Sequence, residues 1–220
     1  MQELPTLVLS FYTFGTMLLK REGNTVTEYP VDPSQIGTML ASNMSFDTGI
    51  LSSNTILIRL NGSKKTVIEY RPPQRTGIYV ERSENPLRAP MPGMLMIRTT
   101  TGDKQASYEI YAVKERPVTG NEMLFSAPLP NIHADGRICW GTVIRVTDEA
   151  MRGTSLAEDW MSLLGSPFND HGVGGKSKAH PKDIRKQLIA LEAKKANAYP
   201  LKDLIPTKKT LKTILALGAS

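Results

Sequence analysis

Cys139 is the only cysteine of the 220-residue chain, and it stands eight residues after Asn131. A lone thiol cannot form an internal disulfide or a cysteine-rich metal site, so its chemistry would be that of a nucleophile or an acyl carrier. An amide side chain such as that of Asn131 can donate a hydrogen bond to a developing oxyanion. Most free cysteines are instead small buried hydrophobic residues, and the cysteine alone does not exclude that reading.

The residues between and beside these two predict a turn. Asp135-Gly136 is a strong turn pair, and Trp140 is expected to be a packing residue beside the thiol. His133 is close to Asn131, but a general base must lie within hydrogen-bond reach of the proton that it removes. In such a turn we expect His133 to be exposed and not to take part in catalysis.

Residues 129–132 (Leu-Pro-Asn-Ile) and 135–139 (Asp-Gly-Arg-Ile-Cys) together resemble the active-site segment of ubiquitin-conjugating enzymes. The signature of that family is His-Pro-Asn-(Ile/Val), a short turn that usually ends in Gly, one residue, and then Ile/Val-Cys. The spacing from Asn to Cys is the same here. The chain departs from the signature at Leu129, where the family has a mainly structural, hydrogen-bonding His, and at Trp140-Gly141, which replaces a common Leu-Asp. The first departure questions the local architecture more than the chemistry.

Further landmarks follow the order found in the divergent bacterial ubiquitin-conjugating-like family that includes PRTRC system protein B. The similarity covers roughly residues 50–170 and is specific only over residues 128–141. The other landmarks are Arg116-Pro117, Leu124-Phe125-Ser126-Ala127-Pro128, Trp160 and Ser166-Pro167-Phe168-Asn169.

The resemblance implies a transferase that carries a ubiquitin-like protein as a thioester on Cys139 and passes it to an amine. Asn131 would donate to the oxyanion or support the adjoining loop. The implied partners are a ubiquitin-like modifier and an adenylating (ThiF-like) activating enzyme, and a deconjugating metalloprotease would fit the same pathway. No cofactor is expected, because the activating enzyme consumes the ATP. Asp148, Asp159 and Asp170 are candidates for the acidic residue that receives the lysine.

A second hypothesis belongs to another class of protein. The chain could be a non-catalytic scaffold of the same fold that binds a ubiquitin-like protein or a plasmid-associated complex, with a basic tail on nucleic acid. An exposed, reactive Cys139 would favour the enzyme, and an inert, buried one the scaffold. A cysteine hydrolase is disfavoured because no His partner for the thiol can be recognised.

Composition limits the class of protein further. The net charge is +6, but residues 176–212 hold 11 Lys and Arg against 3 Asp and Glu, so the rest is close to neutral. A basic tail can contact nucleic acid, although a lysine-rich helix is more often a solvated face. The single cysteine suits a reducing cytoplasm. No apolar run reaches the roughly 20 residues of a membrane span, and three scattered histidines do not predict a metal site.

The elements that position Cys139 predict an α+β protein, and the resemblance implies a ubiquitin-conjugating-like fold. Alternating apolar residues favour an antiparallel meander of about four strands, with flanking helices near residues 154–164 and 181–197 and no strand over residues 84–92. The expected strands cover residues 6–14, 25–29, 56–60, 66–70, 77–80, 93–100 and 107–114, and a short helix is expected over 33–43.

Two regions follow from this reading. Residues 1–172 would form the ubiquitin-conjugating-like domain, with residues 1–45 as a β-rich N-terminal extension. The glycines of residues 172–175 mark a linker, and residues 173–220 would form a basic helical appendage with a second short helix within 201–217. Deleting residues 176–220 should then leave a folded core.

Overall fold

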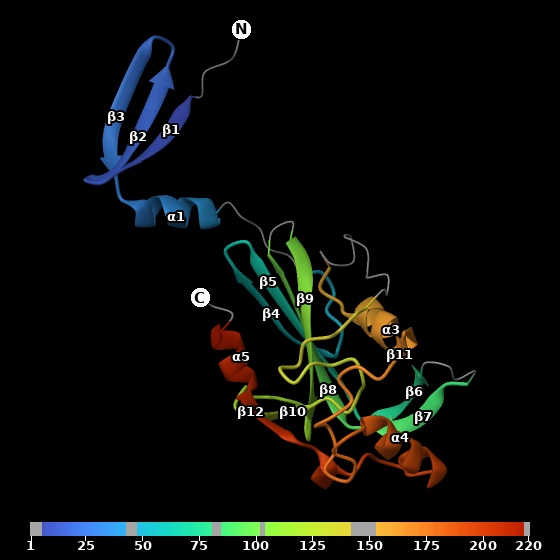
Figure 1. Ribbon diagram of the computed structural model, residues 1–220. Helices are drawn as coiled ribbons and strands as arrows, with labels where there is room; N and C mark the ends of the chain where they lie inside the picture. The colour runs from blue at the N-terminus through green and yellow to red at the C-terminus, as the bar shows by residue number, and fades with distance from the viewer. Residues whose placement is uncertain (1–5, 43–47, 81–84, 102–103, 142–152, 218–220) are drawn as a thin grey trace. The chain divides into compact units, whose positions relative to one another are not determined.

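The structure is a computed structural model that describes residues 6–42, 48–80, 85–101, 104–141 and 153–217 (Figure 1). Its contacts divide the chain into two compact units, Met1–Thr48 and Gly49–Ser220. Strands and helices are both present, and the sheets are mostly antiparallel. The predicted α+β class is therefore confirmed.

The first unit is an antiparallel three-stranded sheet followed by a helix. Its elements are β1 (Leu7–Tyr12), β2 (Gly15–Glu22), β3 (Thr25–Val31) and α1 (Pro33–Ser42). The carboxylate of Asp32 accepts a hydrogen bond from the backbone N–H of Ser34 at 2.8 Å, which caps the first turn of α1 as the Asp-Pro-Ser sequence predicts.

The second unit is built on a six-stranded sheet with the order β12-β10-β9-β8-β5-β4. Neighbouring strands of the predicted meander pair antiparallel, with other strands intervening in the chain between the second and the third. Gly62 and Ser63 form the two-residue turn between the first two, because Asn61 pairs with Lys64. The strands are β4 (Thr55–Asn61), β5 (Lys64–Arg71), β8 (Gly93–Thr101), β9 (Lys104–Val113), β10 (Met123–Ser126) and β12 (Pro206–Thr210).

Both faces of this sheet bury apolar side chains, because successive residues of a strand point to opposite faces. On β8, Met94 and Met96 join the larger core with α3 (Ala157–Gly165) and α4 (Ile184–Ala193). Leu95 and Ile97 join a smaller core with α5 (Leu211–Leu217). Figure 1 shows α5 on the opposite side of the sheet from α3 and α4.

A second, small sheet has the order β11-β6-β7 and consists of β6 (Gln74–Val80), β7 (Leu87–Met91) and β11 (Pro167–Phe168). The expectation of no strand over residues 84–92 is wrong for β7. Its Pro90 pairs with Arg75, and β7 is an edge strand, where a proline without an N–H is tolerated.

The C-terminal residues do not divide from the site-bearing unit at residue 172. The apolar face of α4, which includes Ile184, Leu188 and Leu191, is buried in the larger core. The short helix η1 (Leu201–Asp203) leads into β12, which pairs with β10. A separate appendage from residue 173 is therefore not what the contacts show, because an apolar helix face is buried where it can be covered. Among the described residues, none of the helices has the length and apolar character needed to cross a bilayer.

Candidate functional site

Asn131 and Cys139 lie at the open end of a tight hairpin. The backbone N–H of Cys139 donates to the carbonyl of Asn131 at 2.8 Å, and His133 N–H donates to the carbonyl of Arg137 at 2.8 Å. An antiparallel bridge pairs Ile132 with the residue before Cys139. The structure therefore brings together the two site residues that the sequence singles out.

The returning arm of the hairpin is held by strand β9. Ile110 N–H donates to the carbonyl of Gly136 at 2.8 Å, and Ile138 N–H donates to the carbonyl of Tyr108 at 3.1 Å. Strand β10 pairs with β9 further along, at Tyr111 and Ala112. The hairpin thus takes the place of a neighbouring strand along the remaining edge of β9.

The Asp135-Gly136 turn depends on Tyr111. Gly136 has φ +97, and a Cβ at this position would lie 2.4 Å from the Tyr111 ring. The Tyr111 hydroxyl contacts Glu109 at 2.6 Å and the Asp135 carbonyl, while Lys209 Nζ donates to the same carbonyl at 3.0 Å. Burial, together with the Glu109 carboxylate, raises the pKa of Tyr111. Only glycine combines this backbone conformation with such close packing.

Cys139 is half-buried, and its neighbours Ile138 and Trp140 are each only 8% exposed. The Trp140 ring packs edge-on against Tyr108, with 5.0 Å between the ring centroids, so its predicted packing role is confirmed. Because consecutive residues of an extended segment point to opposite sides, burial of both neighbours directs the Cys139 side chain away from the core. The thiol is therefore not enclosed in the core.

Asn131 is held in the left-handed backbone region, with φ 57, which asparagine tolerates better than most residues. Its N–H donates to the carbonyl of His171 at 2.8 Å, and its side-chain Oδ1 accepts from Asn169 N–H at 3.3 Å. Within the described residues, Nδ2 of Asn131 donates to no other group. The amide therefore supports a neighbouring segment through its oxygen and still has a donor to offer.

That neighbouring segment, residues 169–176, is called the strap here. Gly172 has φ +55, and a Cβ on it would lie 2.5 Å from the carbonyl oxygen of Ile132. Lys176, only 3% exposed, donates through Nζ to the carbonyls of Leu129 at 2.8 Å and Ile132 at 2.7 Å. Burial lowers the pKa of Lys176 to about 7. Residues that the sequence suggested were a linker and a basic tail thus support the loop before the hairpin.

The three acidic candidates differ in their surroundings. Asp170 is exposed and lies in the strap, between the two residues that bond to Asn131. Asp159 is fully buried, so it is not available to an incoming lysine. Asp148 lies outside the described residues. His133 is exposed, as expected.

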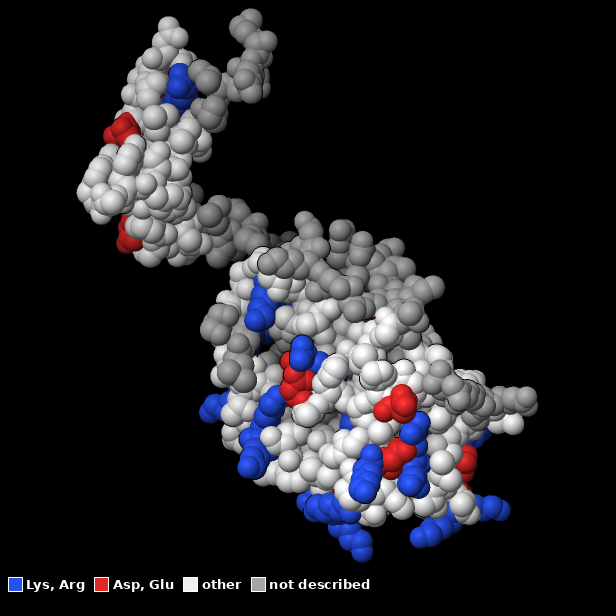
Figure 2. Space-filling view, in the orientation of Figure 1, with Lys and Arg blue, Asp and Glu red and all other residues white. Residues whose placement is uncertain are grey.

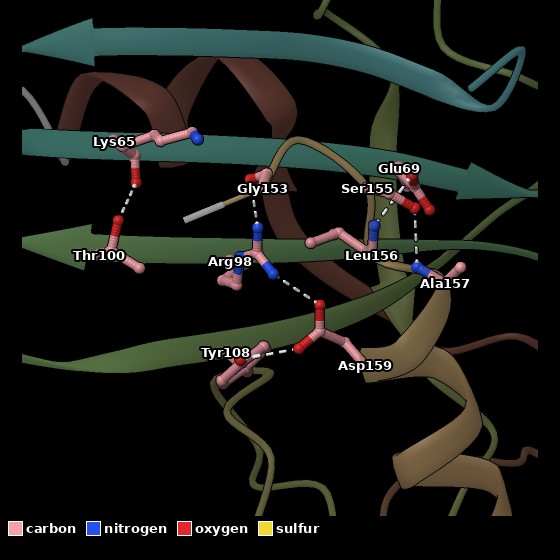
Figure 3. A network of polar contacts seen from close by, with 10 residues as sticks. All are labelled: Lys65, Glu69, Arg98, Thr100, Tyr108, Gly153, Ser155, Leu156, Ala157 and Asp159. Atoms are coloured by element: carbon pink, nitrogen blue, oxygen red, sulfur yellow. Dashed lines mark hydrogen bonds and ion pairs between the residues drawn. The ribbon is translucent and has the colours of Figure 1, made fainter. Parts of the chain in front are cut away.

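A buried polar network holds the start of α3 against the large sheet (Figure 3). Arg98 forms an ion pair with Asp159 at 2.8 Å and donates to the carbonyl of Gly153 at 2.7 Å. The Tyr108 hydroxyl donates to Asp159 at 2.8 Å. Because Tyr108 also accepts a hydrogen bond from the hairpin, the start of α3 and the Cys139 arm are attached to the same strand.

The surface charge around α4 is mixed. Figure 2 shows Lys and Arg side chains there with Asp and Glu among them. The exposed lysines of this part are Lys178, Lys182, Lys186, Lys194, Lys195 and Lys202. Within the described ranges, no three His, Cys, Asp or Glu side chains come together as a metal site would require.

Comparison with known proteins agrees with the geometry. A family model described as prokaryotic E2 family D matches residues 34–207, where E2 denotes a ubiquitin-conjugating enzyme. The match includes the hairpin, the strap and α4. Comparisons with curated proteins and with solved structures gave no match. The chain therefore belongs to prokaryotic E2 family D, a bacterial family of proteins that resemble ubiquitin-conjugating enzymes.

Proposed function

We propose that this protein is a thioester carrier for a ubiquitin-like protein, with Cys139 as the acyl acceptor and Asn131 as the oxyanion donor. The Cys139 thiolate attacks the thioester carbonyl of the modifier on its activating enzyme. A new C–S bond forms, and the thiolate of the activating enzyme leaves. An amine then attacks the Cys139 thioester, a C–N bond forms, and Cys139 leaves as a thiolate while the amine loses a proton.

One observation carries this proposal: Cys139 is half-exposed between the buried residues Ile138 and Trp140 and is joined to Asn131. Its own backbone N–H donates to the Asn131 carbonyl at 2.8 Å. A thiol buried for packing alone would not need this arrangement. The tetrahedral intermediate of aminolysis carries a negative oxygen next to the sulfur, and Nδ2 of Asn131 is a donor of the right kind on the same hairpin.

Asp170 is the described acidic residue best placed to receive the amine. It is exposed, and the residues on both sides of it contact Asn131. A carboxylate beside the reacting carbonyl would hold a protonated lysine and accept its proton.

The implied partners are a ubiquitin-like modifier and an adenylating activating enzyme, with a deconjugating metalloprotease as a further member. The alternative is a scaffold of the same fold that binds the modifier, or a plasmid-associated complex and nucleic acid, without carrying an acyl group. The two functions differ in what happens at Cys139.

The test is a charging assay with ATP and with the cognate activating enzyme and ubiquitin-like protein. Wild-type protein should gain one modifier in a bond that thiol reductants cleave. Cys139→Ser should form a reductant-resistant oxygen ester, and Cys139→Lys should form an isopeptide, which is an amide. Both products should persist because oxygen esters and amides are less activated than thioesters.

Cys139→Ala should remain folded and gain no modifier. If Cys139→Ala accepts the modifier or supports conjugation as well as wild type, the carrier function is wrong and the scaffold replaces it. Asn131→Ala should charge almost normally but discharge to lysine about 10²–10³ times more slowly, which is the usual effect of losing one oxyanion donor.

A further inference from the structure

Lys176 differs from the other basic residues of its region. It is 3% exposed, whereas its neighbour Lys178 is exposed. No carboxylate among the described residues pairs with it, and its two hydrogen bonds go to backbone carbonyls. An ammonium group without a counter-ion is costly to bury, and buried titratable groups of this kind concentrate at functional sites.

The two carbonyls bracket the proposed oxyanion donor. Leu129 lies two residues before Asn131 and Ile132 one residue after it, and Nζ is 2.8 Å and 2.7 Å from their carbonyl oxygens. A single side chain thus fixes both ends of the short loop that carries the Asn131 amide. Leu129 is fully buried and has no polar side chain, so a donor that organises this loop must come from elsewhere in the chain.

We propose that Lys176 is a positioning residue for Asn131, and that its charged ammonium group holds residues 129–132 in the conformation from which Asn131 serves the transfer of the acyl group. The inference rests on the proposed function, since it assigns a role in the reaction at Cys139. Lys176 touches neither the thiol nor the acyl group and acts through the loop.

This arrangement makes the reaction sensitive to the charge of Lys176. Because burial lowers the pKa of Lys176 to about 7, the ammonium form is lost as the pH rises through neutrality. A neutral amine still has N–H donors, but a charge-assisted hydrogen bond is roughly twice as strong. The loop should therefore be held best below about pH 7 and less firmly above it.

Other titratable groups face the same region. Tyr111 and His133 line the small cavity next to Lys176. Ser177, the residue after Lys176, donates a hydrogen bond to Asp203, which also accepts one from Tyr199. Imidazole is the side chain that ordinarily changes charge between about pH 5 and 8, so a His133→Gln variant serves as the control for this residue.

The experiment loads Cys139 chemically, without the partner proteins. A glycine-ended peptide thioester of 2-mercaptoethanesulfonate transfers its acyl group to the Cys139 thiolate, and 2-mercaptoethanesulfonate leaves. Free lysine then discharges the acyl group, and intact mass reports both steps. The variants are Lys176→Met, Lys176→Arg and His133→Gln, with Lys178→Met as the matched control because it removes an exposed lysine two positions away.

We expect Lys176→Met to load Cys139 normally and to discharge about tenfold more slowly than wild type at about pH 6, less than the loss of the Asn131 donor itself. The amine of free lysine also gains or loses its proton with pH, and this changes every discharge rate by the same factor. Dividing each variant rate by the wild-type rate at the same pH removes that factor. This ratio should rise toward one by about pH 9, because wild type has by then lost the charge of Lys176. Lys178→Met should discharge at the wild-type rate at every pH. His133→Gln should keep the change in discharge rate that wild type shows near pH 7.

Lys176→Arg covers the case in which the Met variant fails to fold. Guanidinium stays charged throughout this range, so this variant should discharge without the step near pH 7 that wild type shows. Two results would overturn the role of Lys176 and leave the carrier function standing. One is that Lys176→Arg shows the same dependence of discharge rate on pH as wild type. The other is that the discharge rate of Lys176→Met, divided by that of wild type, does not change with pH. Discharge from wild type no faster than from a synthetic 128–141 peptide overturns the carrier function itself, and the inference with it.

Discussion

The buried ion pair between Arg98 and Asp159 gives the sharpest test of how the second unit is held together. The two side chains are each 1% exposed, with 2.8 Å between Nη1 and Oδ2. Asp159→Asn keeps the shape and an acceptor for the Tyr108 hydroxyl but removes the negative charge. The guanidinium of Arg98 then loses the Asp159 carboxylate, although it still donates to the Gly153 carbonyl.

Removing one partner of a buried ion pair costs about 3–5 kcal/mol. We expect Asp159→Asn to lie near the lower end, about 3 kcal/mol, because its amide oxygen can still accept a hydrogen bond. Asp159→Leu should cost more, since the Tyr108 hydroxyl also loses its acceptor, at about 1–3 kcal/mol for an unsatisfied buried group. A typical domain has only about 5–15 kcal/mol of stability, so either change is severe.

Replacing the whole network is expected to behave differently. Burial raises the pKa of Asp159 even though Tyr108 and Arg98 both favour its charged form, which shows that desolvation offsets much of the attraction. A triple variant, Arg98→Met with Tyr108→Phe and Asp159→Leu, removes the charges and the hydroxyl together. It should recover most or all of the lost stability, as apolar replacements of buried pairs often do.

Urea unfolding at neutral pH measures these differences as free energies of unfolding. Arg137→Gln is the matched control, because Arg137 pairs with Asp135 at 2.7 Å but the two side chains are 66% and 45% exposed. It should change stability by about 0–1 kcal/mol. If Asp159→Asn costs no more than this control, or if the triple variant is less stable than Asp159→Asn, the desolvation argument is wrong.

Three further predictions follow from other parts of the second unit. Gly136→Ala should lower the free energy of unfolding by at least about 2 kcal/mol, because of backbone strain and the 2.4 Å approach to Tyr111. Gly62 has φ +57 and open space around it, so Gly62→Ala should lower the free energy of unfolding by only about 1–2 kcal/mol in the same urea assay. Deleting residues 176–220 should abolish the cooperative thermal transition of the second unit, because it removes β12 and the buried face of α4; a truncated protein that melts cooperatively would restore the boundary at residue 172. Hydrogen bonds from the backbone N–H groups of Thr119 and Val118 lower the pKa of Glu122 from 4.5 to about 2. The stabilisation by the Glu122 carboxylate is therefore complete above about pH 4.5 and is lost as the pH falls toward 2. Glu122→Gln should flatten that part of a pH–stability curve, and an unchanged curve would contradict the assignment.

Local patterns were enough to predict the strands of the meander. β4 and β5 show the period-two alternation of apolar residues, and Asn61-Gly62 predicts a hairpin between them. The hairpin forms one residue later than this pair predicts, since Asn61 pairs with Lys64 and the turn residues are Gly62 and Ser63. The Asp135-Gly136 turn was likewise visible, since both residues have local turn preferences. These features depend on residues close together in the chain, so a single sequence contains the information.

Features that depend on distant partners could not be predicted in this way. β12 was expected to lie in a helical stretch, and its short polar sequence becomes a strand only through pairing with β10, at Phe125 with Pro206 and Met123 with Thr210. Asp159 was grouped with exposed acidic candidates, but Arg98, 61 residues earlier, provides the charge that allows its burial.

Lys176 is the clearest case of a misleading local signal. It is the first lysine of a basic stretch, and such stretches are usually solvated. Its partners are carbonyl groups of residues 129 and 132, and backbone carbonyls leave no mark in a sequence pattern. The related signal that was visible is the glycine cluster at residues 172–175, where Gly172 has to approach the Ile132 backbone closely.

The candidate site is thus assembled from segments that are far apart in the chain. Strand β9 holds the Cys139 arm through Tyr108 and Ile110, the strap holds the Asn131 loop, and Lys209 of β12 holds the Asp135 turn. A fragment that contains the hairpin but lacks the strap or β12 would keep the signature residues and lose their support. For this reason the reactivity of Cys139 should depend on the second unit being complete, and the charging and discharge assays described above require the full chain.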